Sequence, residues 1–212
     1  MSSLTLPISD PQKSLSLAQI KSAALNNHLD PQGLRAVIEV ECRTHGFDAN
    51  KEPTILFERH VFYQRLSLEH KLVVQLKAAY QRPDLCNPVA GGYGLASAQH
   101  GRLQAACQFD RTAALESASW GIGQVMGYQW QALGYPSLQA FINTMYKDEA
   151  SQLDAMLRYI TVNHLSDALN RHDWAAFARG YNGAGFRQNH YDTKLAAAYQ
   201  SLSRTASHLQ NS

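Results

Sequence analysis

Glu41 is the acidic residue whose position in the chain best suits proton-transfer chemistry. Asp30-Pro31 is a helix-start signal, because Asp caps free N–H groups and Pro fits the first helical turn. Helical spacing then puts Glu41 on the apolar face of Leu34, Val37 and Ile38, and Glu39 on the opposite side. A carboxyl group buried without a cation keeps its proton to higher pH and can donate it to a leaving oxygen. The alternative is a buried ion pair with a histidine or with Arg35, Arg43 or Arg59.

A glycine-rich segment, residues 117–127, has a composition that suits the wall of a cleft. It reads Ser-Ala-Ser-Trp-Gly-Ile-Gly-Gln-Val-Met-Gly, and each glycine in a helix interior costs about 0.5–1 kcal/mol relative to alanine. Glycine lets a ligand approach the backbone, Trp120 offers a flat face to a sugar ring, and Ser119 and Gln124 offer hydrogen bonds. Small residues also permit a tight helix–helix crossing, which is the competing interpretation.

A second carboxylate, Glu58, lies inside an apolar and aromatic run. Residues 53–63 favour a short strand that leads into a helix, with Glu58, Arg59 and His60 in its middle. Three ionisable groups in such a run are either solvated along an edge or gathered at a polar pocket. The loop that follows, residues 82–94, is either a surface excursion or a lip over a cleft.

Composition and charge exclude several classes of protein. The chain has 212 residues, 45% of them hydrophobic and 17% charged, which suits one globular domain. Its formal charge of +2 and the lack of a Lys/Arg run argue against a nucleic-acid partner. No apolar run approaches the ~18 residues of a membrane-spanning helix, and the start of the chain does not read as a signal peptide. We therefore expect a monomer made in the cytoplasm, without membrane insertion.

The cysteines and histidines do not form a recognisable chemical motif. Cys42, Cys86 and Cys107 are widely separated and odd in number, which favours free thiols over a disulfide framework or a zinc ribbon. No HExxH motif or closely spaced His/Asp set is present, so we expect no metal ion and no cofactor. A cysteine amidase or peptidase that pairs one thiol with one of the nine histidines is a rival hypothesis, but nothing in the sequence indicates that pairing.

Helical spacing dominates the chain. It predicts a mainly α, single-domain fold with at most a short β segment near residues 53–60. Residues 1–14 read as a flexible leader, 15–205 as the folded domain and 206–212 as a tail. Besides the helix that starts at Asp30-Pro31, helices are predicted over residues 15–25, 68–80, 97–115, 129–133, 137–145, 148–163 and 191–202, and from Asp173 to a glycine-rich turn after Asn182.

Four blocks of sequence resemble a known family when taken in order. Glu41-Cys42, then Gly121 to Gln124, then Ala178 to Gly183 follow the order of motifs in goose-type lysozymes and soluble lytic transglycosylases. More closely, residues 38–42, 55–63, 117–127 and 174–183 look like the N-acetylmuramidase domain of phage endolysins, and the likeness extends over about residues 18 to 203. The resemblance implies a lysozyme-like helical fold that degrades peptidoglycan in the cell wall.

The resemblance also implies roles for individual residues. Glu41 would be the general acid that protonates the glycosidic oxygen, and Cys42 stands where the family usually has serine. Glu58 is the leading candidate for a second carboxylate. The sugar subsites would be lined by Ser119, Trp120, Gln124, Tyr181 and Asn182, with Tyr181 positioning Glu41 or the acetamido sugar.

Three outcomes remain open from the residues. The bond cleaved would be the β-1,4 link between N-acetylmuramic acid and N-acetylglucosamine, either by hydrolysis or by a lytic transglycosylase reaction that gives an anhydro product. Carboxyl groups about 5–5.5 Å apart would imply retention of configuration, and about 6.5–9.5 Å inversion. A glycan-binding module without catalysis is the rival from another class, since the aromatic residues would also suit sugar binding.

Overall fold

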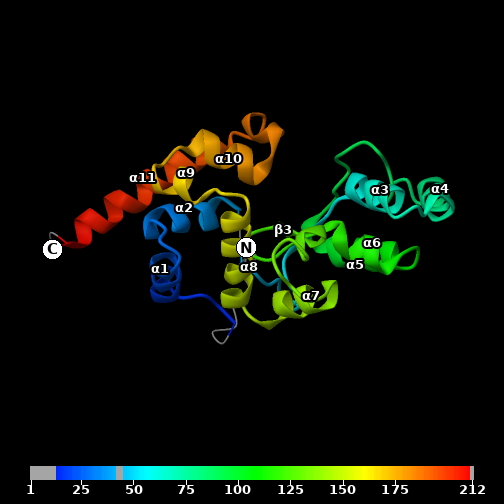
Figure 1. The fold of residues 1–212 in the computed structure, drawn as a ribbon, viewed down its shortest axis with the longest axis horizontal. Coiled ribbons are helices and arrows are strands. Elements are labelled where there is room, and N and C mark those ends of the chain that lie inside the picture. Colours follow the sequence, from blue (N-terminus) through cyan, green and yellow to red (C-terminus); the bar gives the residue numbers. More distant parts are fainter. Residues whose placement is uncertain (1–12, 42–44, 211–212) are drawn as a thin grey trace, which may run out of the picture.

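The computed structural model describes residues 13–41 and 45–210, with no side chains described beyond residue 204. The described part is mainly helical, and Figure 1 shows its helices gathered in two lobes on either side of the long helix α8 (Glu149–Val162). The predicted fold class is confirmed. Most of the predicted leader, residues 1–12, lies outside the described residues, and the last helix runs past the predicted tail boundary to Gln210.

The first lobe carries Glu41. It contains α1 (Leu17–Asn26), α2 (Pro31–Glu41), α9 (Ser166–Asn170), α10 (Trp174–Asn182), the 3-10 helix η3 (Ala184–Arg187) and α11 (Tyr191–Gln210). Asp30 caps α2 as predicted, since its carboxylate accepts from the backbone N–H groups of Gln32 and Gly33 at 3.2 and 3.0 Å. Apolar residues of α1, α2, α8 and α10 form the lobe's core, among them Leu34, Val37, Met156 and Phe177.

The second lobe forms the other side of the molecule. Its helices are α3 (Arg59–Leu68), α4 (Leu72–Gln81), η1 (Ala96–Ala98), α5 (Gln99–Cys107), α6 (Arg111–Glu116), η2 (Gly127–Gln129) and α7 (Leu138–Lys147). The single helix expected over residues 97–115 is wrong in detail. It is divided before Asp110, whose side chain accepts from the Ala113 N–H at 2.9 Å and so starts a new helix.

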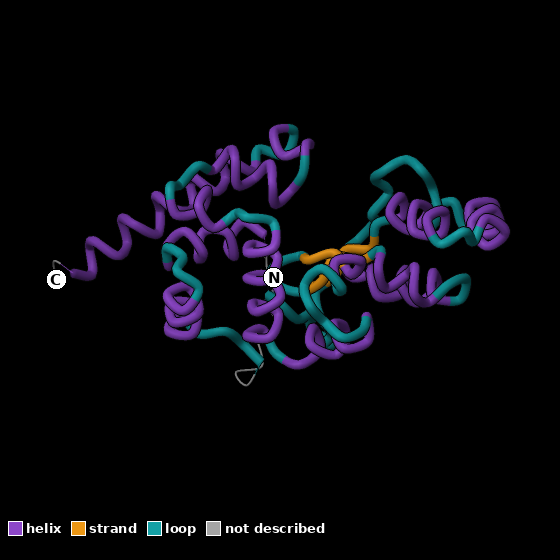
Figure 2. Tube along the Cα trace, in the orientation of Figure 1, coloured by secondary structure: helices purple, strands orange, loops and turns teal. Residues whose placement is uncertain are grey.

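A small antiparallel sheet lies between the lobes (Figure 2). Its strands, in the order β1-β2-β3, are β1 (Ile55–Phe57), β2 (Ala118–Trp120) and β3 (Val125–Met126). The segment 53–60 supplies β1 and then the start of α3, as the sequence predicts. The glycine-rich segment supplies the other two strands as a hairpin, so the helix–helix crossing considered above does not occur there.

Candidate active site

Glu41 is the last residue of α2, at the inner end of the first lobe. It is half-buried, whereas Glu39 is exposed, so the predicted register of the helix is confirmed. Asn182, the last residue of α10, donates from its Nδ2 to Glu41 Oε1 at 2.8 Å. The two helix ends therefore meet at one carboxylate, which the amide holds in a fixed orientation.

Two tyrosines lie beside this carboxylate. Burial raises the pKa of Tyr181 well above its ordinary value, and the nearby charge of Glu41 raises it further. Burial also raises the pKa of Tyr159, on α8, with contributions from Tyr128 and Glu41. The Tyr181 hydroxyl donates to the Gly123 carbonyl at 2.6 Å, so Tyr181 contacts the glycine-rich hairpin rather than donating to the acid itself.

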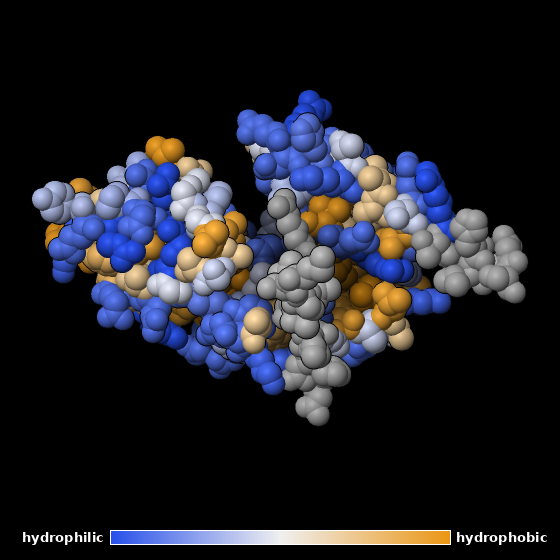
Figure 3. Space-filling view, turned by 180° about the vertical axis from the view of Figure 1, so that it is seen from behind, coloured by the Kyte–Doolittle hydropathy of each residue, from blue (hydrophilic) through white to orange (hydrophobic). Residues whose placement is uncertain are grey.

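The turn of the hairpin forms one wall of an open pocket next to the tyrosines. The space at this pocket, including the part open to solvent, is ≈ 260 Å³, and it is lined by residues 123–126, by Tyr128 and Gln129, and by Tyr159 and Tyr181. Gln124 has a positive φ of 46°, and its amide both donates to the Gly121 carbonyl at 2.8 Å and accepts from the Ser119 hydroxyl at 2.9 Å. In the space-filling view the surface is hollowed between the two lobes (Figure 3).

Two predicted sugar contacts lie in the interior instead. Trp120 is 1% exposed and donates its indole N–H to the Leu115 carbonyl at 3.2 Å, so its ring has no exposed face on which a sugar could stack. The physical reason is the hairpin pairing, which turns the Trp120 side chain into the apolar core of the second lobe. Ser119 is 5% exposed and is engaged with Gln124, so it orients that glutamine and has little surface for a ligand.

Glu58 lies at the other end of the sheet from the hairpin turn. Gly121 bonds to Thr54 at one end of β1, while the Glu58 N–H donates to the Ser117 carbonyl at the other, at 2.9 Å. Four residues of extended chain, from Thr54 to Glu58, span about 13 Å. The structure thus brings Asn182 and Tyr181 to Glu41 and places Gln124 with Tyr181 in the pocket, whereas the Glu58 backbone lies at the end of β1 away from the hairpin turn.

The surroundings of Glu58 nevertheless perturb its carboxyl group. Burial raises the pKa of Glu58, although the neighbouring His60 and a hydrogen bond from Tyr93 act in the opposite direction. Its Oε2 lies 3.2 Å from His60 Nδ1. Tyr93 belongs to the loop after α4, which Arg59 holds by donating to the Val89 carbonyl at 3.0 Å. The polar groups of the 53–63 run therefore gather at one place, which was one of the two alternatives for them.

Sequence reasoning missed the residue that joins these parts, Gln152 of α8. It is 1% exposed, and its Nε2 donates to the carbonyls of Gly46 and Met145 at 3.0 and 2.9 Å. Its Oε1 accepts from the Ile122 N–H at 3.0 Å. Gln152 thus ties the segment after α2 to the glycine-rich hairpin. A lone glutamine inside an amphipathic helix gives no sign of that role, because its partners are distant in the sequence.

The protein is mainly helical, with a small sheet between two lobes and a half-buried glutamate near a pocket. These are the features of a lysozyme-like glycoside hydrolase. The family model for N-acetylmuramidase matches residues 30–203, so the chain belongs to the N-acetylmuramidase family. It is a peptidoglycan-degrading enzyme, as the resemblance implied.

The comparison with solved structures agrees with this assignment. The chain is similar to the protein described as "Crystal structure of Burkholderia AP3 phage endolysin", with 39% sequence identity and a TM-score of 0.80. The match covers 93% of this chain and 73% of that one. The comparison with curated proteins gives no match. Among the described helices, none has both the length and the apolar character that a bilayer-spanning segment requires.

Proposed function

We propose that Glu41 is the general acid of this muramidase and protonates the oxygen of the β-1,4 link between N-acetylmuramic acid and N-acetylglucosamine. The observation that carries the proposal is the 2.8 Å hydrogen bond from Asn182 to a half-buried Glu41 beside the pocket. As the acid gives up its proton, negative charge develops on its carboxylate. A donor already aimed at that carboxylate stabilises the transition state more than the ground state.

The groups around the pocket suit the binding of a sugar. Gln124, Tyr159 and Tyr181 line it from three different elements, and aromatic walls with a few polar groups are typical of ligand sites. Asn182 adds a further group, because its Oδ1 is buried and has no partner among the described residues. We assign Gln124, Tyr181 and Asn182 to substrate binding and positioning, and leave Trp120 out of that set.

Glu58 is proposed to have a supporting role. The Glu58 carboxyl group is engaged by His60 and by Tyr93, which favours a supporting role over that of a nucleophile. A positioned water or the acetamido group of the substrate would then complete the reaction at the anomeric carbon. The acetamido route can also give an anhydro product, so the lytic transglycosylase reaction is retained as the second candidate.

The test is the pair of variants Glu41→Gln and Glu39→Gln, two residues apart on α2. We expect Glu41→Gln to lower the release of reducing ends from purified peptidoglycan by a hundredfold or more, equal to about 3 kcal/mol of barrier. The exposed Glu39 serves as the matched control, and its variant should keep full activity. A folded Glu41→Gln protein with more than about a tenth of normal turnover would refute the assignment.

Mass spectrometry of the released fragments separates the two reactions. Hydrolysis adds one water and leaves a reducing muropeptide, whereas transglycosylation leaves a product lighter by one water. The same proposal includes a monomer that is made in the cytoplasm and reaches the cell wall afterwards. A glycan-binding module without catalysis would bind peptidoglycan and release no fragments.

A further inference from the structure

Two exposed arginines flank the end of α10 that meets Glu41. Arg179 lies three residues before Asn182, and residues three apart are neighbours on the surface of a helix. Arg187 follows five residues after Asn182, in η3. Both arginines are exposed. The amide that holds the proposed acid therefore lies between two cationic side chains in the sequence.

The turn after α10 brings the two arginines to one buried ring. Gly183 has a positive φ of 79°, which suits glycine and lets the chain change direction directly after the helix. Phe186 then packs into the core of the first lobe and is 3% exposed. The guanidinium carbons of Arg179 and Arg187 lie 5.9 and 5.6 Å from the centre of its ring. Figure 1 shows this turn on the side of the first lobe that faces the second lobe.

The two guanidinium groups have no acidic partner within the part of the chain that the structure describes. No described carboxylate forms an ion pair with Arg179 or Arg187. By contrast, Arg65, Arg82 and Arg158 each pair with a carboxylate, at 2.6, 2.8 and 2.7 Å. An arginine presents a planar fork of donors that matches a carboxylate with two parallel hydrogen bonds. Two such forks next to the site can receive anionic groups of a ligand.

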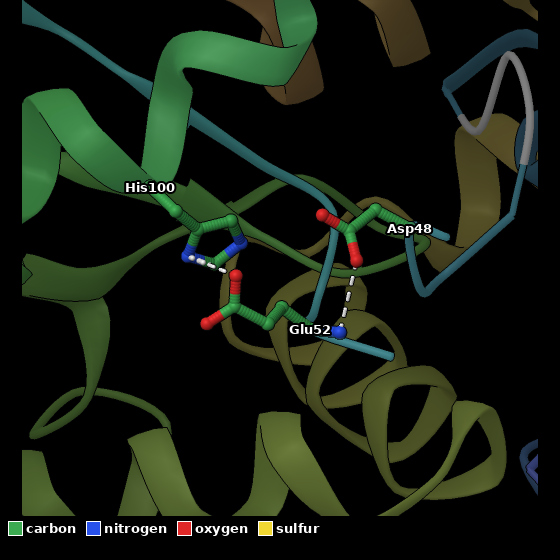
Figure 4. Close-up of side chains that lie close together, drawn as sticks. All are labelled: Asp48, Glu52 and His100. Carbon is green, nitrogen blue, oxygen red and sulfur yellow. Dashed lines mark hydrogen bonds and ion pairs between the residues drawn. The ribbon is translucent and has the colours of Figure 1, made fainter. Parts of the chain in front are cut away.

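The charged groups between α2 and β1 are arranged differently (Figure 4). Asp48 Oδ1 accepts from the Glu52 N–H at 3.0 Å, and Glu52 Oε2 lies 3.9 Å from Nδ1 of His100. The other ring nitrogen, Nε2, lies 2.8 Å from the Pro53 carbonyl oxygen. These groups have partners within the fold, and we infer no ligand for them.

The substrate carries anionic groups within reach of the two arginines. In peptidoglycan the lactyl group of N-acetylmuramic acid bears a short stem peptide, whose free carboxyl groups are ionised at neutral pH. A stem peptide of about four residues spans ~13 Å when extended, whereas the helix rises only about 4.5 Å from Arg179 to Asn182. A peptide attached next to the cleaved bond can therefore reach the arginines while the sugar lies beside Glu41.

We propose that Arg179 and Arg187 bind carboxylates of the stem peptide. This inference rests on the proposed substrate site beside Glu41. The arginines hold a part of the substrate that does not react, so they lower KM and leave kcat largely unchanged. Because both are exposed, each contact changes KM by a small factor, and added salt weakens it.

The test uses peptidoglycan and the same peptidoglycan after a carbodiimide and ammonia have converted its carboxyl groups to amides. The full chain, Arg179→Gln, Arg187→Gln and the double variant are compared by release of reducing ends. On untreated peptidoglycan we expect KM to rise about two- to fivefold in each single variant and further in the double variant, with kcat within about twofold. On the amidated substrate the parent and the variants should share one KM, because the carboxylates are gone.

Arg171→Gln is the matched control, since Arg171 is also exposed but precedes the start of α10. It should match the parent on both substrates. Lysine variants at 179 and 187 keep an aliphatic stem over Phe186 and the charge, but lose the fork. They should give intermediate values of KM on untreated peptidoglycan, and they replace any glutamine variant that thermal unfolding shows to be unfolded.

Two results overturn the proposal. One is an unchanged KM of the folded double variant on untreated peptidoglycan. The other is a rise in KM that is equal on both substrates, since the arginines would then act without the carboxylates and support only the packing of Phe186. Failure of the proposed function is a separate result, because it appears as an unchanged kcat in Glu41→Gln.

Discussion

The hydrogen bond from Asn182 to Glu41 allows the loss of kcat in an Asn182→Ala variant to be predicted. Asn182→Ala removes a donor 2.8 Å from the Glu41 carboxylate, on which the proposed mechanism develops negative charge. A hydrogen bond to a charged group contributes about 1.5–3 kcal/mol, which corresponds to about a 10- to 150-fold loss in kcat. The loss should fall on kcat more than on KM, because the bond strengthens as the proton leaves.

The assay is the release of reducing ends from peptidoglycan over a range of substrate concentrations. Asn27→Ala is the matched control, since Asn27 also donates through Nδ2, at 2.9 Å, but to a neutral carbonyl on α1. Its kcat should remain within twofold of the parent value, and thermal unfolding shows whether each variant is folded. A folded Asn182→Ala enzyme with less than a threefold loss of kcat would refute the argument that this amide stabilises the acid.

Three further predictions concern stability and the thiols. Because burial raises the pKa of Glu58 in the folded protein, ionising it disfavours the native state as pH rises, so Glu58→Gln should gain stability relative to the parent as pH rises above about 4.5 in urea unfolding, and should lose less activity than Glu41→Gln. Gln152→Leu leaves the Ile122 N–H and the Met145 carbonyl without their side-chain partner, which should lower the free energy of unfolding by about 2–6 kcal/mol; a change below about 1 kcal/mol would contradict this reading. Iodoacetamide should leave activity intact, since burial raises the pKa of Cys86 to about 11 and keeps it a thiol, whereas inactivation would revive the cysteine-enzyme hypothesis.

Local signals in the sequence predict a large part of the site. Asp30 caps α2, so the helix starts where expected, and that start alone fixes which face Glu41 takes eleven residues later. The same holds for α10, where Asp173 accepts from the Ala176 N–H at 3.0 Å and the helix ends at Asn182. Each prediction depends on a few neighbouring residues, and for that reason it can be made without knowing the rest of the fold.

Periodicity, in contrast, identifies a helix without telling which face is buried. In α4 the large apolar side chains face outward, with exposed fractions of 58% to 90%, at Leu72, Val73, Leu76 and Tyr80. The buried residues are Ala78 and Gln75, and the Gln75 amide donates to the Tyr63 carbonyl at 2.8 Å. A polar side chain can lie inside when its hydrogen bonds are made there, and only the fold shows where the partner lies.

The same limit explains why the sequence suggested a surface role for Trp120 and no role for Gln152. A tryptophan between glycines suggested a sugar contact, but pairing β2 with β1 turned it inward; an unremarkable glutamine became the junction because three backbone groups from separate segments converge on it. Sequence motifs report the chemistry a residue can perform, whereas its access to substrate is set by long-range pairing. The half-buried position of Glu41 could be predicted because the start of α2 and its apolar face both lie within one helix.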